Sequence, residues 1–129
     1  MSEERSATLQ LELEPEPSTP RAARREFTRM FEDHPCLEVL LLCLSEVVTN
    51  AVLHARTSVT VTVSVSDDDG TVRVEVADLS QVQPVRRRFL EVSPTGRGLH
   101  LLDRLTTDWG IEPSLTGKTV WFEVAGVAP

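Results

Sequence analysis

The sequence predicts an α+β fold, a two-layer α/β sandwich in which helices cover one face of a mixed, mainly antiparallel sheet. Three observations support this prediction. Residues 36–56 have the apolar spacing of a long buried helix, residues 58–66 and 71–79 alternate valine with polar residues, and residues 109–112 and 118–124 are expected to form two further strands. Because each alternating segment has one apolar face, the sheet needs a covering layer, which the helices can provide.

The length of the chain, 129 residues, suits one domain with one hydrophobic core. We therefore expect a single domain over residues 1–129, with residues 1–6 and 126–129 as flexible tails. The formal net charge of −7 argues against direct nucleic-acid binding, which relies on basic side chains. The sequence has no apolar run of membrane-spanning length and no signal-peptide pattern, so we expect a cytoplasmic protein without membrane contact.

The two cysteines, Cys36 and Cys43, are seven residues apart on one expected helix, too far to form a disulfide with each other. We expect both thiols to be reduced and packed as small apolar groups. Cys36 and His34 together provide only two metal ligands, which do not complete a tetrahedral zinc site.

The elements before the long helix follow from alternation and from turn residues. Residues 7–14 alternate leucine with polar residues, which indicates a half-buried strand at a sheet edge, and prolines end it. Ser18 or Thr19 can cap the next helix, which has Pro20 near its first position and runs to about residue 32. Its outward arginines indicate a solvated face, with a partner-binding surface as the alternative.

After the long helix, an Asp-Gly turn at residues 67–70 joins the two valine-rich segments into an antiparallel hairpin. Residues 80–95 show no periodicity and contain two prolines, which indicates a long surface loop of the kind that is often functional. A short helix is expected after Gly98, and residues 109–112 and 118–124 complete the sheet.

Three polar residues interrupt the long apolar helix. Glu46, Asn50 and His54 follow one another at four-residue steps and therefore lie on one stripe. Burying a carboxylate and an amide without partners is costly, so the stripe is expected to face a cleft. The alternative is that these residues form the wet side of the helix. His54 fits a structural role better, because it lies near the helix C-terminus, where the dipole favours a cation.

These residues have the chemistry to bind a nucleoside triphosphate. The Asn50 oxygen suits Mg²⁺, a hard ion that shares its coordination with phosphate oxygens. Glu46 could accept a proton from a water or hydroxyl near the terminal phosphate. Asp78, at a strand end, could accept the amino N–H of adenine, or could simply cap a turn. Gly96 and Gly98 precede a helix whose free N–H groups favour phosphate.

At this point the sequence resembles a known superfamily. Residues 46–55, EVVTNAVLHA, resemble the N box of the GHKL ATPases, which include gyrase B, Hsp90, histidine kinases and MutL. The pattern is similar to the anti-sigma-factor serine kinases of the RsbW and SpoIIAB type, in particular to short single-domain actinomycete members. Residues 96–99, GRGL, and 117–123, GKTVWFE, extend the resemblance over about residues 9–124. It implies a Bergerat-type sandwich.

The resemblance also implies residue roles. Glu46 corresponds to the general base, Asn50 to the Mg²⁺ ligand and Asp78 to the aspartate that binds adenine. The remaining cofactor-binding residues implied by the resemblance are Gly96, Arg97, Gly98 and Leu99 beside an ATP lid formed by residues 80–95, and Thr119, which supports Asp78 and adenine. The glycines that usually follow the adenine-binding aspartate are absent after Asp78, as in short actinomycete members.

The activity implied is that of a protein serine/threonine kinase and anti-sigma factor that uses ATP and Mg²⁺. It would transfer the γ-phosphoryl group to a serine of an anti-anti-sigma (STAS-type) partner and would hold a sigma factor. The altered segment after Asp78 favours an alternative, a nucleotide-gated binding module with little or no kinase activity. A small scaffold without nucleotide is a third possibility. Residues 9–13 could pair across a homodimer, as the resemblance implies.

Overall fold

The computed structural model describes residues 5–80 and 100–126, apart from the side chains of residues 5–8 and of His54. Three α-helices, one π-helical segment and five strands occur in these ranges. In chain order they are β1 (Arg5–Leu13), α1 (Thr19–Met30), α2 (Leu37–Asn50), η1 (Ala51–Ala55), β2 (Val59–Ser66), β3 (Val72–Asp78), α4 (His100–Leu105), β4 (Asp108–Pro113) and β5 (Lys118–Val124). The order agrees with the sequence prediction, and most bounds differ by one or two residues.

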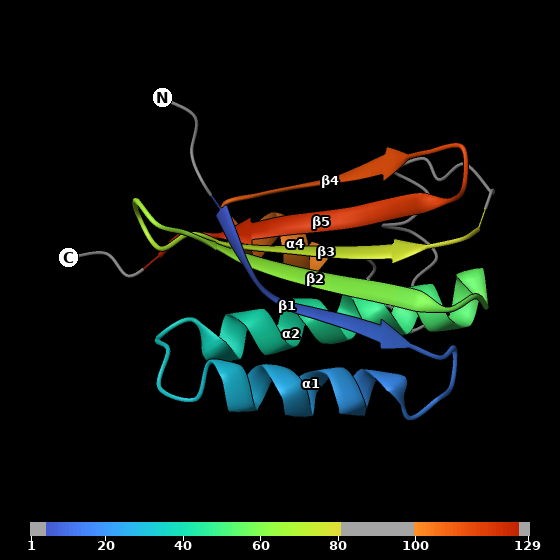
Figure 1. Cartoon of the computed structure of the whole chain (residues 1–129), viewed down its shortest axis with the longest axis horizontal. Coiled ribbons are helices and arrows are strands. Elements are labelled where there is room, and N and C mark those ends of the chain that lie inside the picture. The colour runs from blue at the N-terminus through green and yellow to red at the C-terminus, as the bar shows by residue number, and fades with distance from the viewer. Residues whose placement is uncertain (1–4, 81–99, 127–129) are drawn as a thin grey trace.

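The five strands form one sheet in the order β1-β2-β3-β5-β4 (Figure 1). Every pairing between these strands is antiparallel, so the parallel component allowed by the prediction of a mixed sheet is not found among the described strands. Figure 1 shows α1 and α2 side by side along one side of the sheet. The predicted α+β fold with helices on one face is therefore confirmed, and β1 lies at an edge as expected.

The core lies between the sheet and the two long helices. Phe27 from α1 and Leu40 and Leu44 from α2 are fully buried, as is Phe122 from β5. The alternate valines of β2 and β3 meet them from the sheet. The other faces of β3 and β5 carry polar groups, among them Arg73, whose guanidinium bonds the carboxylates of two neighbouring glutamates at 2.8 and 2.9 Å. Alternation in the strands thus separates a covered apolar face from a polar one.

The turn before α1 depends on Thr19 rather than on Ser18. The Thr19 hydroxyl donates to the Glu14 carbonyl, whereas the Ser18 side chain makes no capping bond. Pro20 lies in the first turn of α1, where a missing N–H costs nothing.

The long helix expected over residues 36–56 is not uniform. After Asn50 the α-helix changes to the wider π-helical segment η1. The Arg56 N–H donates a hydrogen bond of 3.4 Å to the Ala51 carbonyl, five residues earlier, which is the π-helical spacing. Arg56 then ends the segment in the left-handed region, with φ 57°. This change of helix type begins directly after Asn50, one of the predicted site residues, and π-helical segments often occur at functional sites.

None of the helices in the described ranges combines the length and the apolar character needed to cross a membrane.

Candidate functional site

Glu46 and Asn50, the polar pair predicted on the long helix, are buried and do not lie on its solvent-exposed face. Glu46 is 2% exposed and Asn50 is 3% exposed, one turn apart near the end of α2. Within the part of the chain that the structure describes, neither the nitrogen nor the oxygen of the Asn50 amide has a hydrogen-bond partner. Leaving a buried polar group unsatisfied costs about 1–3 kcal/mol, so the site is built at the expense of stability.

Asp78 ends β3 on the covered face of the sheet, and its carboxylate is already engaged. Oδ2 of Asp78 lies 2.7 Å from Nζ of Lys118, and both side chains are almost fully buried. Oδ1 of Asp78 accepts a hydrogen bond of 2.8 Å from the Ser80 backbone N–H. The predicted adenine-binding carboxylate is therefore held in a buried ion pair across the β3–β5 ladder, in which Asp78 and Lys118 are register partners.

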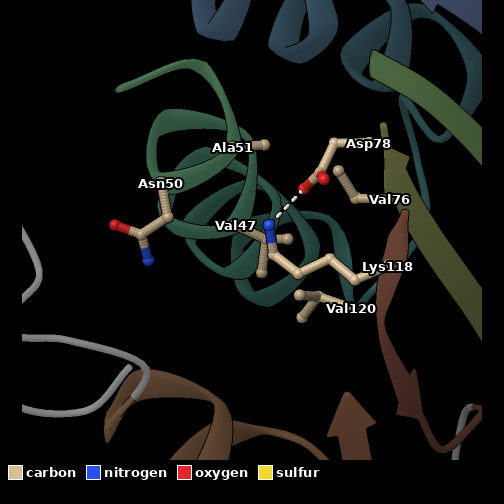
Figure 2. Close-up of a pocket in the computed structure, with 7 residues that line it drawn as sticks. All are labelled: Val47, Asn50, Ala51, Val76, Asp78, Lys118 and Val120. Carbon is tan, nitrogen blue, oxygen red and sulfur yellow. Dashed lines mark ion pairs between the residues drawn. The ribbon is translucent and has the colours of Figure 1, made fainter. Parts of the chain in front are cut away.

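A small cavity joins these groups. Its lining residues come from α2, η1, β3 and β5, and they are Val47, Asn50, Ala51, Val76, Asp78, Lys118 and Val120 (Figure 2). The space between them measures about 10 Å³, which is roughly the room that one water molecule needs. In Figure 2 the Lys118 side chain crosses the cavity to reach Asp78, while the Asn50 amide points away from this ion pair. Lys118 thus fills the space beside Asp78.

Thr119 is not placed where the resemblance implied. It pairs with Ala77 in the β3–β5 register, while Asp78 pairs with Lys118. Because successive side chains of a strand point to opposite faces, Thr119 lies on the face of the sheet away from Asp78. Lys118 occupies the position beside the aspartate instead.

The sequence prediction missed Lys118, although a signal was present. Lys118 has the same parity as Val120, Phe122 and Val124, the apolar residues of β5, so alternation alone places it on the covered face. It is also the single lysine of the whole chain.

Several predicted site residues lie outside the described residues. They are Gly96, Arg97, Gly98 and Leu99, together with nearly all of the predicted lid at residues 80–95. The side chain of His54 also falls outside. The structure therefore brings together Asn50 and Asp78 around one cavity, with Glu46 buried one turn earlier on α2, and leaves the predicted phosphate-binding segment a prediction.

A larger hollow of about 650 Å³ lies elsewhere, between the start of α1 and the end of α2. Its lining includes Arg21, Arg24, Thr49 and Leu53, but not Glu46, Asn50 or Asp78. Size alone would favour it as a ligand site, but the buried polar residues Asn50, Asp78 and Lys118 line the small cavity.

Comparison with known proteins agrees with the fold. The solved RsbU and RsbW domains of Rv1364c from Mycobacterium tuberculosis resemble the chain with a TM-score of 0.71 at 19% identity. The similarity covers 95% of this chain and 34% of the other, so the chain spans about a third of the length of that protein. A search of curated proteins found no match. The profile of the histidine kinase-like ATPase domain matches residues 13–124, almost the full length, and the chain therefore belongs to the histidine kinase-like ATPase domain family.

Proposed function

We propose that this chain is an ATP-binding regulatory protein that transfers the γ-phosphoryl group of ATP to a serine of an anti-anti-sigma partner of the STAS type. The same protein would hold a sigma factor until that partner displaces it. Membership of an ATPase domain family implies ATP binding. The observation that carries the proposal is the buried Asn50 amide without a hydrogen-bond partner, one turn from the buried Glu46.

The residues at the phosphate end fit Mg²⁺. Mg²⁺ in nucleotide sites takes one or two protein oxygens and fills its octahedron with waters and phosphate oxygens. The Asn50 oxygen is available for this role, because no other described group uses it. When bound, Mg²⁺ neutralises charge on the phosphates, which is most of what phosphoryl transfer requires from a site.

Glu46 is the proposed general base. It accepts the proton of the serine hydroxyl as the serine oxygen bonds to the γ-phosphorus and the bond to the ADP oxygen breaks. Glu46 is buried on α2, and a buried position of the base would limit hydrolysis in competition with transfer. Gly96, Arg97, Gly98 and Leu99 remain the proposed phosphate-binding segment.

The test is transfer of labelled phosphate from ATP to candidate STAS partners. Glu46→Gln is expected to lower the transfer rate by about 100-fold or more while ATP still binds, since general-base catalysis contributes that much. Glu38→Gln is the matched control, because Glu38 is an exposed glutamate on the same helix and should leave the rate unchanged. Transfer at the wild-type rate in Glu46→Gln would contradict the assigned base.

A second candidate function is a nucleotide-gated binding module with little kinase activity. The observation in its favour is the Lys118–Asp78 ion pair, which occupies the part of the site where adenine is expected to bind. In that case ATP would select a protein partner by shifting a conformational equilibrium. Partner binding that depends on ATP, without transfer of label to any partner, would distinguish this function from the kinase.

A further inference from the structure

The expected adenine pocket is filled by a side chain of the protein itself. We propose that Lys118 sets the nucleotide affinity of this site by competing with the adenine amino group for Asp78, so that ATP binds only when Lys118 leaves. This inference rests on the proposed ATP-binding function and deepens it, because it names the residue that controls access to the adenine pocket.

The first support is chemical. The adenine amino group is a hydrogen-bond donor, and it needs an acceptor at the base of the pocket. The acceptor is the Asp78 carboxylate, but Oδ2 already faces the Lys118 ammonium at 2.7 Å and Oδ1 accepts the Ser80 N–H. An ammonium has three donors and no acceptor, so an incoming amino group would meet another donor.

The second support is steric. The space left between Val47, Asp78, Lys118 and Val120 measures about 10 Å³, which excludes any purine ring. Most of the other lining side chains, those of Val47, Ala51, Val76 and Val120, are short, whereas Lys118 has a long unbranched stem. Moving that stem is therefore the change that opens the pocket with the least disturbance of the fold.

The third support is the position of Lys118 at the first residue of β5, directly after the turn at residues 114–117. A lysine at the end of a strand can keep its stem against apolar surface while its ammonium reaches water. Its exit would leave the Asp78 carboxylate buried without its charge partner, a costly state unless adenine takes the vacated place. Exit of Lys118 and entry of ATP are therefore coupled.

This coupling predicts that the apparent affinity of the wild-type protein for ATP is lowered. When the binding-competent state is a minor one, the observed dissociation constant rises by the inverse of its population. Removing the lysine removes that penalty, and removing the aspartate as well removes the adenine contact.

The first experiment is calorimetric titration of ATP with Mg²⁺ into the wild type, Lys118→Met and the double variant Lys118→Met/Asp78→Asn. Lys118→Met is expected to bind ATP about 10-fold more tightly than the wild type, because the methionine side chain makes no ion pair with Asp78 and leaves the pocket without separating charges. The double variant, which buries no unpaired charge, should lose that gain because its amide offers adenine a weaker acceptor. Equal or weaker binding by a folded Lys118→Met would overturn the proposal.

The second experiment needs no variant, so it decides the question even if Lys118→Met does not fold. Lys118 is the single lysine of the chain, so Lys118 and the N-terminal amine are the two amines that an amine-reactive acylating reagent can modify. Lys118 is expected to be protected without nucleotide and to become reactive with Mg²⁺ and ATP, measured by mass spectrometry with the N-terminal amine as internal reference.

The outcomes separate this inference from the proposed function. If the wild type binds ATP while Lys118 stays equally protected, the competition is refuted and ATP binding stands. If neither the wild type nor a folded Lys118→Met binds ATP, the proposed function fails and the inference fails with it.

Discussion

At the scale of single residues, the pKa of Cys43 reflects the buried part of α2 that also contains Glu46, the proposed general base. Cys43 is fully buried on α2, three residues before Glu46. Burial, and secondly the nearby Glu46 carboxylate, raise the pKa of Cys43 from 9.0 to about 12. The thiol is therefore protonated at neutral pH, and the thiolate, which is the reactive form, is absent.

This pKa predicts a loss of stability in alkali. Between about pH 9 and pH 12 the native thiol keeps a proton that the unfolded thiol releases, so the free energy of unfolding falls as the pH rises. One such group lowers it by at most about 1.4 kcal/mol per pH unit. Cys43→Ala should show a shallower fall, measured by urea unfolding at several pH values. The chain contains no tyrosine and one lysine, so few other groups titrate in this range. Equal slopes in both proteins would contradict the assignment.

At the scale of elements, the junction of β3 and β5 positions the ion pair of the site. Gly117 precedes Lys118, and a Cβ on Gly117 would lie 1.9 Å from the Asp78 carbonyl oxygen and 2.8 Å from the Leu79 Cα. Both neighbours are backbone atoms, which cannot move aside as a flexible side chain can. The close approach of these strands therefore requires glycine at this position.

Gly117→Ala is expected to destabilise the protein by about 3 kcal/mol, the upper part of the usual range for overpacking. It should also weaken ATP binding, because it forces Asp78 away from its place at the end of β3. Gly70→Ala is the matched control. Gly70 has φ 72° but its added Cβ would meet nothing closer than 3.7 Å, so only the conformational strain of about 1 kcal/mol applies. Denaturant midpoints measure both effects, and equal losses would refute the steric argument.

At the scale of the whole molecule, the sheet has one face covered by helices and one edge formed by β1. The half-buried leucines of β1, Leu9, Leu11 and Leu13, pack against the core, while Gln10 and Glu12 are exposed. The outer side of an edge strand presents N–H and C=O groups that can pair with another chain. A homodimer formed through β1 is therefore compatible with the fold and stays a prediction.

Sedimentation tests this prediction directly. The expected result is a mass that rises with concentration from 14.3 kDa toward twice that value. Moderate salt should favour pairing, because each copy carries a formal charge of −7 and salt screens the repulsion between copies. A mass that remains that of one chain at high concentration would contradict the dimer.

Sequence patterns predicted the order of the elements, the α+β class and the burial of Glu46 and Asn50, and the motif at residues 46–55 predicted the family. The element order, the fold class and the burial of the polar pair depend on local periodicity, because an apolar helix period or a strict valine alternation is a strong local signal. The widening of the helix after Asn50 could not be predicted, since the apolar spacing of residues 51–55 suits an α-helix equally well.

Which side chains meet at the expected adenine end of the site depends on how the strands pair in the folded chain. Asp78 and Lys118 are forty residues apart, and their contact depends on the register of β3 against β5. Because side chains alternate at every residue, a shift of one position exchanges Thr119 for Lys118 beside Asp78. The resemblance pointed to the threonine, whereas the pairing of the strands placed the lysine there and closed the cavity around it.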